Sequence, residues 1–291
     1  MTWYAYALLG SFFNAVALES IAHFKVDSLK LTFGTSVAIF FILLPTLFLV
    51  PLPEEISFYL LGLFIGFLSV YADIKMFDLA KVYGSRAVSI YTAMKILLVF
   101  VCWQILFPSS FLELTAEPLI AAGIIACLAI TCFSVYLMSN HSVSWAVLVA
   151  LIPVAAVLAV GDISTKLGIQ AAGDAARTWE SAALFVWLVG IGNMVISGPM
   201  QYLRGDKENR YMNRYDWSVS IGLGALYVLV LISTVSAQLD VPNPAYVNAI
   251  VVLGLVWLLI YHKMRGTPDT TNPAAALLFV LSAAGIILLT S

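Results

Sequence analysis

Residues 56–79 read ISFYLLGLFIGFLSVYADIKMFDL and carry the features that set the fold class. The stretch is apolar for long enough to cross the hydrocarbon core of a bilayer as one helix, which takes about 20 residues. Gly62-x-x-x-Gly66 gives this helix a small-residue surface for close contact with another helix. Asp73 then places a carboxylate within the same apolar stretch, where an ionisable group is a candidate functional residue. The stretch therefore predicts one transmembrane helix of a larger bundle.

The rest of the chain repeats this pattern. Together with 56–79, further apolar runs predict ten spans, the others being 3–22, 31–50, 86–107, 118–138, 143–165, 180–203, 217–238, 245–263 and 273–290. The first run lacks a basic leader and is expected to be a retained helix rather than a signal peptide. Only 10% of the 291 residues are charged and 62% are hydrophobic, with a mean hydropathy of +0.99, whereas soluble domains carry about 25% charged residues. We expect an all-α, multi-pass protein of the plasma (inner) membrane.

The ten spans fall into two sets of five, residues 1–139 and 140–291. Motifs of the first set recur in the second: Gly62-x-x-x-Gly66 with Ser220-x-x-x-Gly224, and Glu19-x-x-x-His23 with Asp162-x-x-x-Lys166. Because each set has an odd number of spans, the second copy enters the membrane upside down relative to the first. Inverted repeats are the architecture of many secondary transporters, with the substrate site between the copies.

Three segments add a resemblance to a known family: the short hairpin 80–87, the acidic loop 111–117 and the motif Asp162-Ile-Ser-Thr-Lys-Leu-Gly168. With the ten spans, they make the whole chain resemble the EamA-like branch of the drug/metabolite transporter superfamily. The resemblance implies a secondary transporter of small organic solutes, often an exporter, with a central cavity between the two halves. It implies no particular substrate.

Basic loop residues are unevenly divided between the two faces of the membrane. One face carries Lys166 and Arg177, and the other carries Lys25, Lys30, Lys81, Arg86, Arg204, Lys207, Arg210, Arg214, Lys263 and Arg265. By the positive-inside rule the richer face is cytoplasmic, which places both termini outside. The family resemblance implies the opposite orientation, with both termini inside.

Lys95 and Asp73 are the most deeply placed charges. Counted from the hairpin between spans three and four, they differ in depth by about three residues, or roughly 4–5 Å at the helical rise. A lysine side chain covers that distance, so we predict that the two groups pair. The pair serves either as a structural link between neighbouring helices or as part of the substrate cavity. Tyr91 and Tyr71 lie near these charges and are predicted cavity walls, with core packing as the alternative.

The other intramembrane charges have simpler interpretations. Glu19 is expected beside His23, either as a helix-end pair or as the carboxylate that couples transport to protons. Asp162 and Lys166 have the spacing of a helical ion pair. Lys75 and Asp78 are expected to form a local ladder with Lys81 near the interface.

These features favour a secondary active transporter of a small polar metabolite, amino acid-like or otherwise zwitterionic, that works by alternating access. The stretch Tyr91-Thr-Ala-Met-Lys-Ile-Leu97 is similar to part of the nucleotide-sugar transporter branch, which keeps phosphorylated or nucleotide-sugar-like anions as an alternative. A membrane enzyme or a non-transporting scaffold is the alternative from another class. A homodimer is left open.

Several classes of site are not expected. The net charge of −2 and dispersed basic residues give no footprint for nucleic acid. There is no Walker A, HExxH, GxSxG or CxxC motif, so we predict no ATP-driven pump, no catalytic residues, no metal and no cofactor. Cys102, Cys127 and Cys132 are interpreted as core packing.

Overall fold

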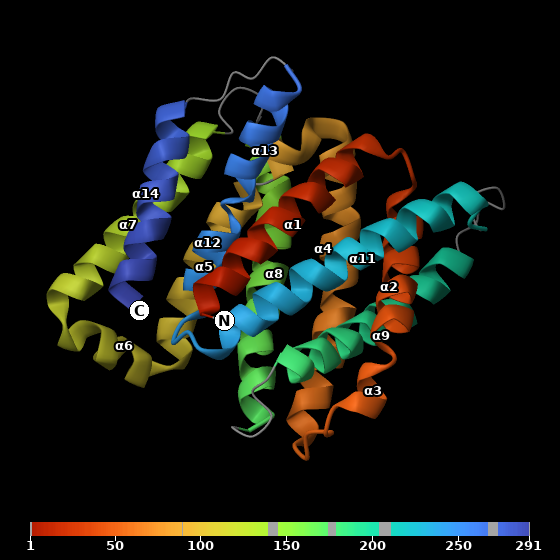
Figure 1. The fold of residues 1–291 in the computed structure, drawn as a ribbon, viewed down its shortest axis with the longest axis horizontal. Helices are drawn as coiled ribbons and strands as arrows, with labels where there is room; N and C mark the ends of the chain where they lie inside the picture. The colour runs from red at the N-terminus through yellow and green to blue at the C-terminus, as the bar shows by residue number, and fades with distance from the viewer. Residues whose placement is uncertain are drawn as a thin grey trace.

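The computed structural model describes residues 2–88, 90–138, 145–173, 179–203, 211–266 and 273–290, and all regular secondary structure in these ranges is helical (Figure 1). The helices are α1 Trp3–His23, α2 Ser28–Leu43, α3 Thr46–Leu49, α4 Ile56–Val88, α5 Ile90–Leu106, α6 Pro108–Ala116, α7 Pro118–Met138, α8 Trp145–Ala171, α9 Trp179–Leu203, α11 Arg214–Leu239, α12 Pro244–Val251, α13 Gly254–Met264 and α14 Pro273–Thr290. The predicted all-α class is confirmed.

Eight helices in the described ranges are long and apolar enough to cross a membrane: 3–23, 28–49, 56–84, 118–137, 149–171, 179–203, 214–239 and 244–264. The chain is thus a multi-pass membrane protein by the length and composition of its helices. The other two predicted spans correspond to shorter helices. α5 passes the same test only together with α6, from which it is bent by 101°, and the apolar helix 274–290 is shorter than the others. The count of ten spans stays a prediction.

Two helices extend beyond their predicted ends. α4 continues past residue 79 to a break at Gly84, whose φ of 83° lies in the left-handed region that glycine adopts without strain. The predicted hairpin 80–87 is therefore mostly helix. α8 continues past residue 165 to Ala171, so the motif from Asp162 to Gly168 lies inside a helix rather than at its end.

The N-termini of two helices are capped by side chains, as a helix start requires. Asp27 accepts the backbone N–H of Leu29 (3.0 Å) and of Lys30 (3.2 Å) at the start of α2. Asn213 and Asp216 form a reciprocal capping box at the start of α11. Asp216 also accepts from Lys30 Nζ at 3.0 Å, so the two capped ends are joined by a buried ion pair.

The centre of the bundle is built by α4, which packs on α8 and α9. A Cβ at Gly66 would collide with the backbone of α9 at Gly192 and Asn193, so the small residues allow these two helices to touch along their backbones. The opposite face of α4 carries Leu60, Phe64, Phe67 and Tyr71, which are 43–59% exposed. That face is suited to contact with lipid.

The second predicted small-residue surface contacts α2. A Cβ at Gly224 would meet Ala38 and Thr35, and Gly34 lies equally close to Ser220. On the far side of the molecule, α7 and α14 pack side by side and contact the bundle mainly through α5 and α12 (Figure 1). Both predicted small-residue surfaces therefore join helices from different halves of the chain.

Candidate functional site: a polar cavity between the halves

A cavity of about 190 Å³ lies in the middle of the bundle. Its described lining comes from α1, α2, α4 and α5 of the first half and from α8, α9, α11 and α12 of the second. Three of the predicted site residues, Asp73, Tyr91 and Lys95, are among the side chains that line it. The helix packing described above thus encloses polar groups from both halves within an otherwise apolar bundle.

Lys95 pairs with Asp162, and the predicted pairing with Asp73 is wrong. Lys95 Nζ lies 2.9 Å from Asp162 Oδ2, and the two side chains are 12% and 20% exposed. Asn248 donates to the same carboxylate oxygen at 2.8 Å. Similar depth does not bring Lys95 and Asp73 together, because α5 packs on α8 and makes few contacts with α4, although α4 precedes it in the chain. The ion pair therefore links the first half of the chain to the second.

Asp73 is held by neutral groups instead. Asn193 on α9 donates its amide to Asp73 Oδ2 at 3.0 Å and to Ser69 Oγ at 2.8 Å. Ser36 on α2 donates to the amide oxygen of Asn193 at 2.7 Å. Among the described residues, no Lys, Arg or His lies within ion-pair distance of Asp73. The Asp73 side chain is thus oriented by a hydrogen-bonded network, without a cationic partner among the described residues.

Tyr91 and Tyr71, both predicted cavity walls, are placed differently. Tyr91 is four residues before Lys95 on α5, shares its helix face, lines the cavity and is only 7% exposed. Tyr71 is 44% exposed and is not among the residues that line the cavity. It precedes Asp73 by two residues, which places it about 200° around the helix. Tyr71 therefore belongs to the outward face of α4.

Asn193 and Tyr227 are among the cavity residues that were not singled out from the sequence. Asn193 interrupts an apolar span, and a carboxamide within a span indicates a hydrogen bond to a neighbouring helix, so the sequence did contain a signal for this residue. Tyr227 on α11 packs near Phe77, with ring centroids 6.2 Å apart, and both rings line the cavity. The Tyr227 hydroxyl is buried and has no hydrogen-bond partner among the described residues. Nothing in the sequence separated this tyrosine from the many others.

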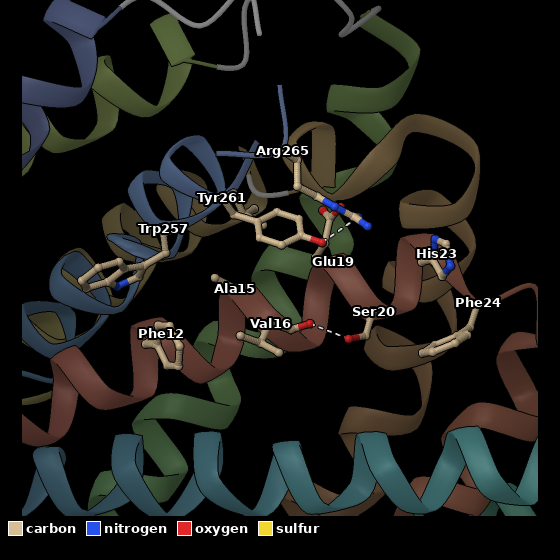
Figure 2. A pocket seen from close by; sticks show the side chains of 11 residues that line it. Phe12, Ala15, Val16, Glu19, Ser20, His23, Phe24, Trp257, Tyr261 and Arg265 are labelled. Carbon is tan, nitrogen blue, oxygen red and sulfur yellow. Dashed lines mark hydrogen bonds between the residues drawn. The ribbon is translucent and has the colours of Figure 1, made fainter. Parts of the chain in front are cut away.

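Glu19 lies in a different cavity, a groove of about 420 Å³ between α1 and α13 (Figure 2). Glu19 Oε1 is 3.2 Å from His262 Nε2, so its partner is His262 rather than the predicted His23. Arg265 donates to the Tyr261 hydroxyl at 2.8 Å at the same end of the groove. The other end is apolar, with Phe12 and Trp257 in edge-to-face contact. The groove does not include Asp73, Lys95 or Tyr91.

The predicted pair of Asp162 with Lys166 is also replaced by contacts between helices. Lys166 is buried and donates to the carbonyl oxygens of Gln238 (2.6 Å) and Leu239 (3.2 Å), at the C-terminal end of α11. A cation is favourable there because the helix dipole is negative at that end. Asp162, its predicted partner, is held by Lys95.

The predicted ladder on α4 is replaced by a link to α2. Ser28 Oγ donates to Asp78 Oδ1 at 2.5 Å and accepts from Lys81 Nζ at 2.6 Å. Lys75 is exposed and takes no part in this link. A polar contact between two helix ends therefore stands where the sequence predicted a contact along one helix.

The described residues include no cluster of three or more His, Cys, Asp or Glu side chains that would suit a metal ion. Cys102, Cys127 and Cys132 are free thiols of intermediate exposure. Cys132 Sγ approaches the backbone oxygen of Ala93 at 3.6 Å, which is a packing contact between α7 and α5.

Comparison with known proteins identifies the fold alone. No protein family matches the chain, and no curated protein matches it. Among 14 matching chains of known structure is one described only as the crystal structure of a protein. It is 18% identical, with a TM-score of 0.63 over 99% of this chain and 96% of that chain. This likeness covers nearly the full length of both molecules and concerns their shared fold.

Proposed function

We propose that the chain is a secondary active transporter that moves a small polar metabolite, amino acid-like or otherwise zwitterionic, by alternating access. The observation that carries the proposal is the central cavity, where the ion pair Lys95–Asp162 and the carboxylate of Asp73 lie between the two halves of the chain. Burying these groups in a membrane protein costs free energy, and ionisable groups at such depth usually mark a substrate or ion pathway.

Two inverted five-helix repeats, 1–139 and 140–291, form part of this proposal, and the helix contacts support them. The proposed counterparts are α1 and α8, α2 and α9, α4 and α11, α5 and α12–α13, and α7 and α14. If the repeats are real, each contact between two helices should recur between their counterparts. The contact of α4 with α9 corresponds to that of α11 with α2. The contact of α1 with α11 corresponds to that of α8 with α4. The contact of α5 with α8 becomes that of α12 and α13 with α1, and α2–α9 and α7–α14 map onto themselves.

Membership of the EamA-like branch of the drug/metabolite transporter superfamily is proposed on the same grounds. Ten spans in two copies and a cavity between them complete this picture. The basic face is proposed to be cytoplasmic, which is opposite to the orientation that the resemblance implies. In this arrangement the copies rock against each other and expose the cavity to each side in turn. A plasma-membrane location is proposed with it.

Two alternatives are less well supported. Lys95 is the cation that an anionic or nucleotide-sugar-like substrate would need, but it is already neutralised by Asp162. The cavity volume of about 190 Å³ is also below the 300–1,000 Å³ that drug-sized ligands occupy. The function of a membrane enzyme or a scaffold does not require charged groups from both halves to face one cavity.

Uptake by purified protein in proteoliposomes tests the proposal. We expect saturable uptake of at least one solute from a panel of amino acids, amines and phosphorylated sugars. The double variant Lys95→Met with Asp162→Asn removes both charges of the cavity pair together and should reduce this uptake at least about tenfold. Lys75→Gln, which changes an exposed lysine of α4, is the matched control and should transport normally. Liposomes that take up no member of the panel faster than protein-free liposomes would contradict transport.

A further inference from the structure

The charge of the central cavity is not balanced. Its described lining contains three formally charged side chains, Asp73, Lys95 and Asp162. Lys95 and Asp162 neutralise each other at 2.9 Å, which leaves Asp73 as the acidic side chain of the described lining that has no cationic partner. A cavity with one uncompensated negative charge attracts cations and repels anions.

The partners of Asp73 orient its carboxylate without neutralising it. Asn193 donates to it at 3.0 Å and is itself fixed by Ser36 at 2.7 Å and Ser69 at 2.8 Å. All these partners are neutral. A carboxylate so held is pre-organised for a charge-assisted hydrogen bond, which is about twice as strong as a neutral one.

Aromatic rings lie on the same side of the cavity as this carboxylate. Phe77 follows Asp73 by one helical turn, and the ring of Tyr227 packs near Phe77 at 6.2 Å between centroids. Tyr227 lines the cavity, and its buried hydroxyl has no hydrogen-bond partner among the described residues. Its oxygen is therefore available to accept a hydrogen bond from a bound solute, and the rings attract a cation through their faces.

We propose that Asp73 binds the ammonium group of the transported solute and that the cavity selects small organic amines with a net positive charge. The aromatic rings of Tyr227 and Phe77 surround the bound cation, and the Tyr227 hydroxyl accepts one of its N–H groups. This inference rests on the proposed transport function, and among small polar metabolites it favours cations over the zwitterions proposed above. Among the described lining residues a substrate carboxylate meets no free cation, since Lys95 is occupied by Asp162.

The size of the cavity limits the amine to a small one. A volume of about 190 Å³ is below that of pockets for drug-sized ligands. Probes with five carbon atoms and head groups of different charge therefore suit the test: 1-pentylamine as the cation, norvaline as the zwitterion, pentanoate as the anion and 1-pentanol as the neutral control.

Binding of these four probes is measured on the purified protein in detergent, by the shift in Tm as the probe is titrated. We expect 1-pentylamine to bind at least about tenfold more tightly than each of the other three. Asp73→Asn should weaken the binding of 1-pentylamine at least about tenfold and leave the binding of 1-pentanol unchanged, because only the charge-assisted contact is lost. Asp78→Asn removes a carboxylate from the same helix outside the cavity and is the matched control, with wild-type affinity expected.

A second variant covers the case in which Asp73→Asn does not fold. Tyr227→Leu leaves the Asp73 carboxylate intact and removes the aromatic ring and hydroxyl of Tyr227. It should weaken the binding of 1-pentylamine several-fold. Unchanged amine binding in whichever of the two variants folds would overturn the proposal.

The outcomes separate this inference from the transport proposal. Tighter or equal binding of norvaline or pentanoate, or binding of none of the four probes, would overturn the cation inference. Amine binding that depends on Asp73, in a protein that moves no solute in proteoliposomes, would instead contradict the transport function alone.

Discussion

At the scale of single residues, the partners of the buried charges Lys95 and Asp73 follow from which helices pack together. Lys95 and Asp73 were recognised because an ionisable side chain inside an apolar run is conspicuous, and both line the cavity. Their partners depend on which helices pack together, which hydropathy does not encode. Lys95 meets Asp162 because α5 packs on α8, and Asp73 meets Asn193 because Gly66 and Gly192 bring α4 and α9 together.

The ion pair Lys95–Asp162 should be energetically coupled. Lys95→Met or Asp162→Asn alone leaves one charge buried without its partner and should lower the free energy of unfolding by about 3–5 kcal/mol, whereas the double variant should lose much less than the sum. A double-mutant cycle in detergent unfolding measures this difference. The comparison cycle, Lys95→Met with Asp73→Asn, should be close to additive. The reverse pattern would restore the pairing of Lys95 with Asp73.

Glu19 is our candidate for proton coupling, and it lies outside the central cavity beside His262. Because glutamine keeps the shape of the side chain but cannot carry a proton, Glu19→Gln should abolish uphill uptake driven by a pH gradient. Exchange of labelled for unlabelled solute without a gradient should continue in this variant. Glu113→Gln, on the exposed face of α6, is the control and should retain both activities. Uphill uptake at the wild-type rate in Glu19→Gln would remove Glu19 from the coupling mechanism.

At the scale of helices, the sequence predicted most elements to within a few residues. Apolar runs bounded by charged or Pro-containing segments located α1, α7, α9 and α14 closely. The ends of α4 and α8 were placed too early because charged residues were taken as the limit of each span. Lys166 shows why a charged residue need not end a helix. Its ammonium group is buried at the C-terminal end of α11, where a backbone carbonyl oxygen accepts its hydrogen bond in place of water.

The contact of α4 with α9 should depend on Gly66. A Cβ there would meet backbone atoms of Val189, Gly192 and Asn193, which cannot move without separating the helices. Gly66→Ala should therefore destabilise the protein by about 1–3 kcal/mol, the usual cost of overpacking. Gly222 on α11 has open space around it, and Gly222→Ala should be neutral or slightly stabilising. Unfolding in detergent compares the two, and equal stability of both variants would contradict a backbone contact at Gly66.

At the scale of the whole molecule, the charged face of the bundle predicts its orientation. Four basic residues assigned to the richer face lie near helix ends and not in the middle of spans: Lys30, Lys81, Lys263 and Arg265. The overall arrangement of helices was inferred from weak internal matches, such as Gly62-x-x-x-Gly66 with Ser220-x-x-x-Gly224. Their roles became interpretable only when each was found to contact the other half of the chain.

The positive-inside rule gives a direct prediction for the C-terminus. A reporter fused after Ser291 should show extracytoplasmic activity, because the loops richest in Lys and Arg remain in the cytoplasm. Fusions to alkaline phosphatase and to green fluorescent protein are compared, because the two reporters respond oppositely to an extracytoplasmic and a cytoplasmic C-terminus. A fluorescent C-terminal fusion without phosphatase activity would reverse the orientation and place both termini inside.

Access to the central cavity from the two sides of the membrane tests the transport mechanism most directly. Thr35 lines the cavity, and its hydroxyl is bonded within its own helix to the backbone oxygen of Leu31 at 2.7 Å, so Thr35→Cys disturbs little. In a background in which Cys102, Cys127 and Cys132 are replaced, alternating access predicts that a membrane-impermeant maleimide labels this cysteine both in right-side-out and in inverted vesicles. Labelling from one side only, or from neither side, with the protein folded, would contradict a cavity that opens in turn to each side.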